Sequence, residues 1–79
     1  LRALGDLQGA EAVFRHAIQV ASGSADVWLF YRELAVTLAM MGRKSEAEEA
    51  AREAWRQAPA AQQPELQSLF AQLGLSIQP

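Results

Sequence analysis

Apolar residues recur at intervals of three and four along most of this chain, which is the spacing of one face of an α-helix. The clearest series lies in the middle of the chain and comprises Val27, Tyr31, Leu34, Ala35 and Leu38. Together with the segments on either side, it predicts four amphipathic helices, at about residues 7–21, 26–41, 46–58 and 64–74. The predicted fold class is therefore all-α, with neighbouring helices arranged as antiparallel hairpins.

Polar residues, glycine and proline mark where the predicted helices begin and end. Asp6 is placed to cap the first helix, and Ser45 is placed to cap the third. Because Glu48 follows Ser45 by three residues, we expect a capping box at this helix start. Gly42 follows the second helix, where glycine commonly ends a helix, and Pro59 stops the third.

The predicted third helix has two sides of different character. One side carries only small residues, which let a neighbouring helix approach closely: Ala47, Ala50, Ala51, Ala54 and Ala58. The other side is charged and carries Glu46, Glu49, Glu53 and Arg56. We interpret this charged side as a solvated surface rather than a binding or catalytic site.

The chain also repeats itself. A shift of 37 residues places the first predicted helix on the third, and a shift of 35 places the fourth on the second. One complete unit carries, in order, Tyr31, Leu34, Ala35 and Leu38 on its first helix, Gly42 in the turn, Ala47 and Ala54 on its second helix, and Pro59 at its end. In these positions the chain resembles the tetratricopeptide repeat family.

The resemblance implies one domain over residues 1–79. It comprises a partial repeat at 1–22, a full repeat at 25–59, and a C-terminal capping helix and tail at 64–79. Repeats of this kind bury their apolar faces against their neighbours, and fewer than three are generally insufficient for stability. We therefore expect the chain to be a fragment of a longer protein or to associate with itself.

In this family the first helix of each repeat lines a concave surface that receives a peptide, a helix or a neighbouring domain. The resemblance therefore implies that a partner is bound by Trp28, Leu29, Arg32, Glu33, Val36, Ala39 and Met40. Methionine adapts to irregular apolar partners, which favours a hydrophobic helix or peptide. Arg32 alone does not form the basic cluster with which some members hold a C-terminal carboxylate. In an equally weighted interpretation, Leu29, Val36 and Met40 pack on a further repeat or on a second chain.

Charge and composition exclude some classes of partner. The chain has seven Lys and Arg against nine Asp and Glu, for a net charge of -2, so it lacks the basic surface expected for nucleic acid or anionic membrane. No apolar run approaches the roughly 20 residues that cross a bilayer. Frequent Ala and Arg favour a GC-rich, hence bacterial, source, and nothing indicates a compartment.

The residues needed for catalysis or metal binding are also scarce. The chain has no cysteine and one histidine, so we predict no metal, no cofactor and no catalytic residue. His16 lies beside the apolar series of its helix and is interpreted as an exposed surface residue.

The sequence thus favours a non-catalytic scaffold that binds a protein or peptide. One alternative is a structural homo-oligomerisation element with Trp28, Leu29 and Phe30 as contacts. The other is an accessory domain of a larger enzyme.

Overall fold

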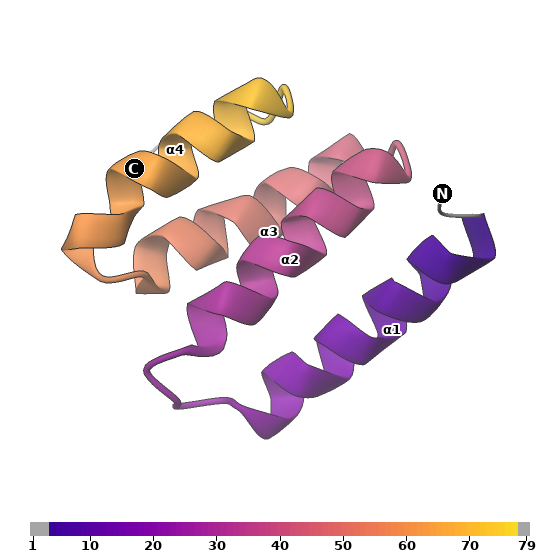
Figure 1. The fold of residues 1–79 in the computed structure, drawn as a ribbon, viewed down its shortest axis with the longest axis horizontal. Helices are drawn as coiled ribbons and strands as arrows, with labels where there is room; N and C mark the ends of the chain where they lie inside the picture. The colour runs from indigo at the N-terminus through magenta and orange to yellow at the C-terminus, as the bar shows by residue number, and fades with distance from the viewer. Residues whose placement is uncertain (1–3, 78–79) are drawn as a thin grey trace.

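A computed structural model describes residues 4–77 as four α-helices joined by short connections (Figure 1). The helices are α1 (Leu4–Val20), α2 (Val27–Met40), α3 (Lys44–Gln57) and α4 (Gln63–Gln72), and a 3₁₀ turn, η1, covers Ala60–Gln62. No strand occurs within residues 4–77, which confirms the predicted all-α class. None of the described helices combines the length and apolar character needed to cross a membrane.

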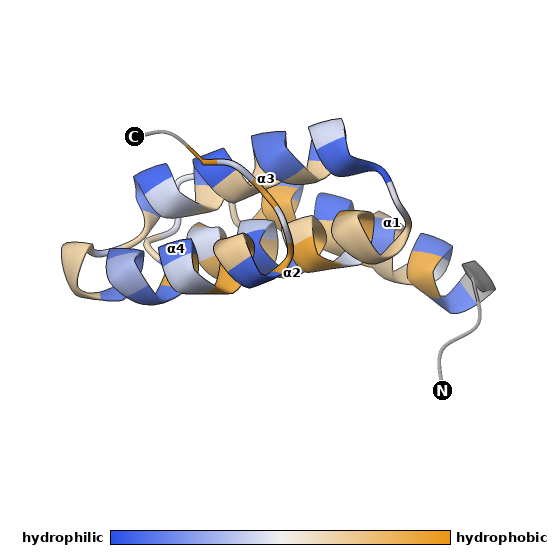
Figure 2. Cartoon of the chain, turned by 90° about the horizontal axis from the view of Figure 1, so that it is seen from above, coloured by the Kyte–Doolittle hydropathy of each residue, from blue (hydrophilic) through white to orange (hydrophobic). Residues whose placement is uncertain are grey.

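Each helix packs mainly against its neighbours along the chain. The most extensive contact joins α2 to α3, and α2 also packs on α1 while α3 also packs on α4. Viewed from above, α3 lies in a layer behind α2 and α4, and its outward side is hydrophilic (Figure 2). This arrangement is the predicted stack of antiparallel helical hairpins.

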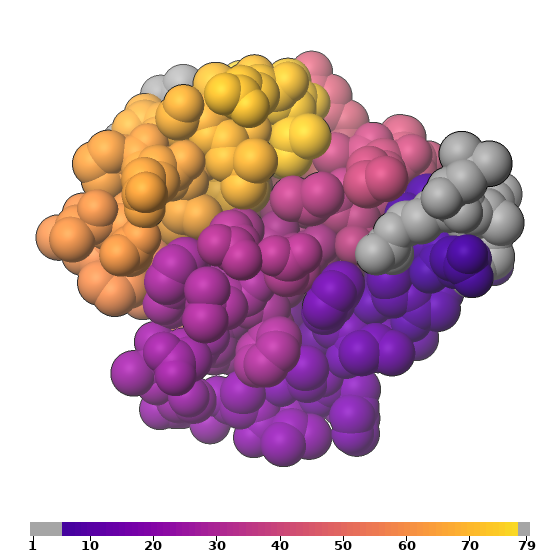
Figure 3. Space-filling view, in the orientation of Figure 1, coloured from indigo at the N-terminus to yellow at the C-terminus, as the bar shows by residue number. Residues whose placement is uncertain are grey.

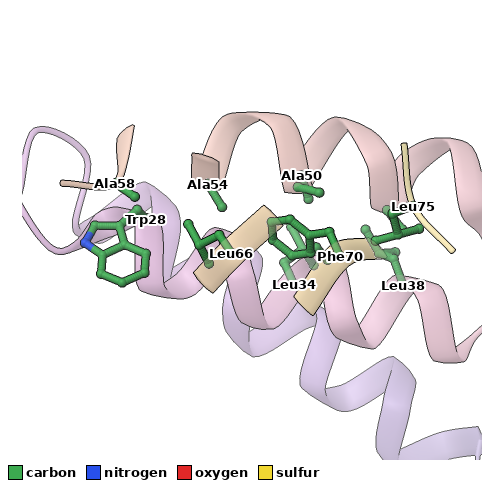
Figure 4. Close-up of a cluster of buried hydrophobic side chains, with 12 residues drawn as sticks. Trp28, Leu34, Leu38, Ala50, Ala54, Ala58, Leu66, Phe70 and Leu75 are labelled. Atoms are coloured by element: carbon green, nitrogen blue, oxygen red, sulfur yellow. The ribbon is translucent and has the colours of Figure 1, made fainter. Parts of the chain in front are cut away.

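The alanines of α3 form the centre of the core. Three of them are completely buried, namely Ala47, Ala51 and Ala54. Because these side chains are small, larger residues of α2 and α4 fill the space against them, as Figure 4 shows for Leu34 and Phe70. Phe70 and Leu38 are the largest fully enclosed side chains. The predicted small side of the third helix is therefore the packing surface for two other helices.

Glycine ends α2 in the predicted position. Gly42 has a φ of 79°, in the left-handed region that favours glycine. The N–H of Gly42 donates to the carbonyl of Ala39, and the N–H of Arg43 donates to the carbonyl of Leu38 at 3.0 Å. This pair of bonds is a Schellman motif, which satisfies carbonyls that the end of a helix leaves unpaired.

The predicted capping box of α3 is wrong. The helix begins one residue before Ser45, and no side chain caps its first turn. The turn at Gly42 leads directly into the helix, so the carbonyl of Arg43 accepts a helical bond from the N–H of Ala47 at 2.9 Å. Glu48 instead accepts a hydrogen bond from the N–H of Ser76 at 2.8 Å. That bond attaches the C-terminal tail to α3.

The predicted cap of α1 is also wrong, because the helix begins before Asp6 and places this residue in its first turn. An acidic side chain there still interacts favourably with the helix dipole. The start predicted for this helix differs from the observed one by three residues, and every other predicted helix end lies within two. After α4 the tail packs against the core, with Leu75 only 5% exposed and Ile77 in contact with the buried cluster.

Candidate functional site

The seven residues predicted to bind a partner all lie on α2, and their exposure differs widely. Trp28 is only 7% exposed and belongs to the core cluster, whereas Met40 is 55% exposed. The others are half-buried, namely Leu29, Arg32, Glu33, Val36 and Ala39. The structure therefore brings the predicted residues together on one helix but gives Trp28 a packing role.

An apolar ridge runs along the side of α2 that is only partly covered. We define the apolar ridge as Leu29, Val36 and Met40, which follow one another at intervals of seven and four residues. At 3.6 residues per turn, Val36 lies roughly opposite the buried Leu34 on the helix surface. Most of the ridge therefore points away from the side of α2 that forms the core. Leu29 packs partly against the core cluster, and the ridge becomes most exposed at Met40.

A small groove lies between α2 and α4. This α2–α4 groove has a volume of about 190 Å³ and is lined by Trp28, Arg32, Gln62, Glu65, Leu66 and Leu69. The surfaces of α2 and α4 adjoin on the face shown in Figure 3. The guanidinium of Arg32 lies 5.9 Å from the centre of the Trp28 ring and donates a hydrogen bond to Glu33 at 2.8 Å. The groove therefore combines three apolar side chains with the polar residues Gln62 and Glu65 and one oriented cation.

A larger hollow opens between α1, α2 and α3. This α1–α2–α3 hollow has a volume of about 320 Å³. Its lining comprises Tyr31, Leu34 and Leu38 from α2, Arg15 from α1, and Glu46, Glu49, Ala50 and Glu53 from α3. The charged side of α3, interpreted from the sequence as solvated surface alone, thus forms a wall of a hollow. Residue spacing did not reveal this hollow, because Arg15, which faces Glu46 across it, lies 31 residues away in the sequence.

Four charged residues connect α1 with α3 at this hollow. We call Glu11, Arg15, Arg43 and Glu46 the ion-pair cluster. Arg43 donates to Glu11 at 2.6 Å and makes two hydrogen bonds to Glu46, at 2.8 and 2.6 Å. Arg15 donates to Glu11 at 2.9 Å and lies 3.4 Å from Glu46. A single arginine in the turn before α3 therefore binds carboxylates from two helices.

These bonds change the acidity of the two glutamates. Hydrogen bonds from Arg43, and then from Arg15, lower the pKa of Glu11 below its ordinary value. A hydrogen bond from Arg43 likewise lowers the pKa of Glu46, and the carboxylates raise the pKa of Arg43. Each shift favours the charged form of its group, because a hydrogen bond between a charged donor and a charged acceptor is stronger than one between neutral groups.

The remaining glutamates of the hollow differ in their pairing. Glu53 accepts hydrogen bonds from Arg56 and Gln57 of its own helix, and the bond from Arg56 lowers its pKa. Glu49 lies between Glu46 and Glu53 along α3 and is exposed. Within the described residues, it has neither a hydrogen bond from a side chain nor an ion pair. It is therefore the uncompensated negative charge of this wall.

Histidine and cysteine, the residue types that most often bind transition metals, are represented by a single histidine in the described part of the chain. No group of three or more His, Cys, Asp or Glu residues within it is arranged to hold a metal ion. His16 is exposed on α1, as the sequence predicted.

Comparison with known proteins gives one match. A family model described as Tetratricopeptide repeat matches residues 1–73. No curated protein and no solved structure matches the chain. The matched range includes all four helices and therefore the apolar ridge, the α2–α4 groove and the α1–α2–α3 hollow.

Proposed function

The chain belongs to the tetratricopeptide repeat family, whose repeats generally mediate protein–protein interaction, and we propose that it is a non-catalytic scaffold that binds an apolar peptide or helix. The proposed contact surface is the apolar ridge together with the α2–α4 groove beside it. The observation that supports this surface is the 55% exposure of Met40 on a helix whose other side places Leu34, Ala35 and Leu38 in the core.

The chemistry of the surface favours a partner with an apolar side of its own. Covering apolar area contributes about 25 cal/mol per Å², and the flexible side chain of Met40 adapts to partners of different shape. Arg32 and Glu33 lie close to the ridge and form an ion pair at 2.8 Å. Their charges fix the orientation of a bound helix more than they add to its affinity. An amphipathic helix or an extended peptide with regularly spaced apolar residues fits these requirements.

The test begins with selection of binding peptides from a displayed library against the 79-residue chain. For each selected peptide, Met40→Glu should weaken binding at least tenfold, because the ridge then presents a charge to an apolar partner. Val13→Glu is the matched control, since Val13 is a similarly exposed apolar residue, at 63%, on α1. It should change affinity less than twofold. Equal affinity of all selected peptides for the Met40→Glu variant and the original chain would place their site elsewhere.

Self-association is the second candidate, and a different surface supports it. The contacts suggested from the sequence included Trp28, which the structure buries. Among residues 6–20 of α1, the large apolar residues that are exposed are Val13 and Val20, at 63% and 73%, and their spacing of seven residues places them on one side of the helix. Sedimentation equilibrium should then show a mass that rises with concentration and returns to that of a monomer in the Val13→Glu, Val20→Glu double variant. A monomeric mass at every concentration of the original chain excludes this candidate.

A further inference from the structure

The α1–α2–α3 hollow is separate from the surface proposed above. Its floor uses Tyr31, Leu34 and Leu38, which lie on the core side of α2, whereas the apolar ridge lies on the more exposed side. Its volume of about 320 Å³ is at the small end of the range of about 300–1,000 Å³ typical of ligand sites. The hollow therefore fits one or two side chains of an extended segment, not a packed helix.

The floor of the hollow is apolar. Leu34 and Leu38 are 3% and 1% exposed, and Ala50, from α3, is 7% exposed. Tyr31 is half-buried and adds an aromatic ring to the lining. A floor of this kind accommodates the aliphatic part of a long side chain, while the charged end of that side chain reaches the rim.

The rim determines which charge the hollow accepts. Three cations beside its glutamates, Arg15, Arg43 and Arg56, are each bonded to a carboxylate. Arg52, three residues after Glu49 on α3, is exposed and makes no ion pair within the described residues. Glu49 is not paired in this way with any described residue, and it stands midway along the acidic side of α3. A cationic side chain therefore finds an available partner in the hollow, whereas an anionic one meets a row of carboxylates.

We propose that the α1–α2–α3 hollow binds a Lys or Arg side chain from an extended basic segment of a partner protein. The aliphatic part of that side chain lies against Tyr31, above the buried Leu34 and Leu38, and its charged end pairs with Glu49. The ring of Tyr31 offers an additional cation–π contact. Because this site and the apolar ridge lie on different sides of α2, one chain can hold two segments at the same time.

A defined pair of peptides tests this proposal. The probe is a fluorescein-labelled octapeptide of alternating leucine and arginine, and its matched control carries uncharged citrulline in place of every arginine. Fluorescence anisotropy with the 79-residue chain at low salt should show binding of the arginine peptide and at least tenfold weaker binding of the citrulline peptide. Equal affinity for the two peptides contradicts the proposal.

Two matched variants separate the hollow from general charge attraction. Glu49→Gln should lower affinity for the arginine peptide about tenfold while leaving the circular dichroism spectrum unchanged, since Glu49 is exposed. Asp26→Asn removes the same charge at an exposed position outside the α1–α2–α3 hollow and the α2–α4 groove, and it should change affinity less than twofold. Equal effects of the two variants would show non-specific attraction and would overturn the proposal.

The same peptide and protein test where the cationic side chain binds and whether it must come from a peptide. Amide chemical shifts should move most at Tyr31, Glu49 and Ala50 when the arginine peptide is added, and Met40→Glu should not weaken this binding. Shifts confined to α4 and the apolar ridge contradict the site. Spermine that competes as strongly as the peptide would show a site for small polyamines, which also contradicts the proposal. Because Met40 lies outside the hollow, either result leaves the proposed function of the ridge standing, and shifts at the ridge would support it.

Discussion

At the scale of single residues, two glycines show how backbone conformation decides whether an added side chain lowers or raises the free energy of unfolding. Gly42 has a φ of 79° in the turn after α2, whereas Gly9 lies within α1. An added Cβ would meet no atom within 4 Å at either position, so space does not distinguish them. The backbone does, because L-residues with a side chain rarely adopt the left-handed region.

The same substitution should therefore have opposite effects at these two positions. Gly42→Ala should destabilise the fold by about 1–2 kcal/mol, the cost of left-handed backbone for a residue with a Cβ. Gly9→Ala should stabilise it by about 0.5–1 kcal/mol, because alanine loses less backbone freedom in a helix. Urea denaturation of both variants measures the two changes. Destabilisation of similar size in both would contradict the assigned turn at Gly42.

At the scale of helices, α1 is held to the stack by ionic contacts as well as by packing. Leu7, which is 8% exposed, is its single buried residue among residues 6–20, and Phe14 and Ile18 are half-buried against the core. The ion-pair cluster joins the same helix to α3 and to the turn before it. The attachment of α1 should therefore depend on pH and salt more than the contact between α2 and α3.

The direction of the pH dependence follows from the lowered pKa values of Glu11 and Glu46. In acid the unfolded chain binds protons more readily than the folded chain, since its carboxyls keep the ordinary value of 4.5. Stabilisation by the cluster is therefore complete above this value and is lost as pH falls through the lower folded values. Thermal denaturation should show a lower Tm at pH 3 than at pH 7.

Two arginine variants test whether the cluster causes this change. Arg43→Gln should reduce the difference in Tm between pH 7 and pH 3, because the cation that lowers both pKa values is removed. Arg52→Gln changes an exposed arginine of α3 outside the cluster and should preserve the difference. The cluster would have no such role if both variants kept the full pH dependence.

The elements themselves were largely predictable from sequence, because intervals of three and four residues are local information. The start of α3 was not predictable in this way. Ser45 is a residue type that commonly caps helices, but the turn at Gly42 leads directly into a helix that begins one residue before Ser45. The ion-pair cluster was missed because Glu11 and Arg43 are 32 residues apart. Trp28 was assigned to a binding surface because apolar residues occur on several sides of α2, and spacing alone does not show which side is covered.

At the scale of the whole molecule, the four helices depend on one another through α3. Its buried alanines contact side chains from both α2 and α4, and α1 in turn packs on α2. Losing α4 would uncover the part of the apolar surface of α3 that α2 does not cover. A stack this short should therefore unfold as one unit, although repeat proteins are stabilised mainly by contacts between neighbours.

Phe70→Ala tests this dependence from one end of the stack. The completely buried ring lies between α4 and α3 (Figure 4), and its removal should cost about 3–5 kcal/mol. Because domains of this kind are stable by only about 5–15 kcal/mol, the loss should lower the urea midpoint of the entire chain. Backbone amide resonances of α1 and tryptophan fluorescence should report the same midpoint. Loss of α4 structure at a urea concentration where α1 and α2 remain folded would instead show that the stack unfolds helix by helix from its C-terminal end.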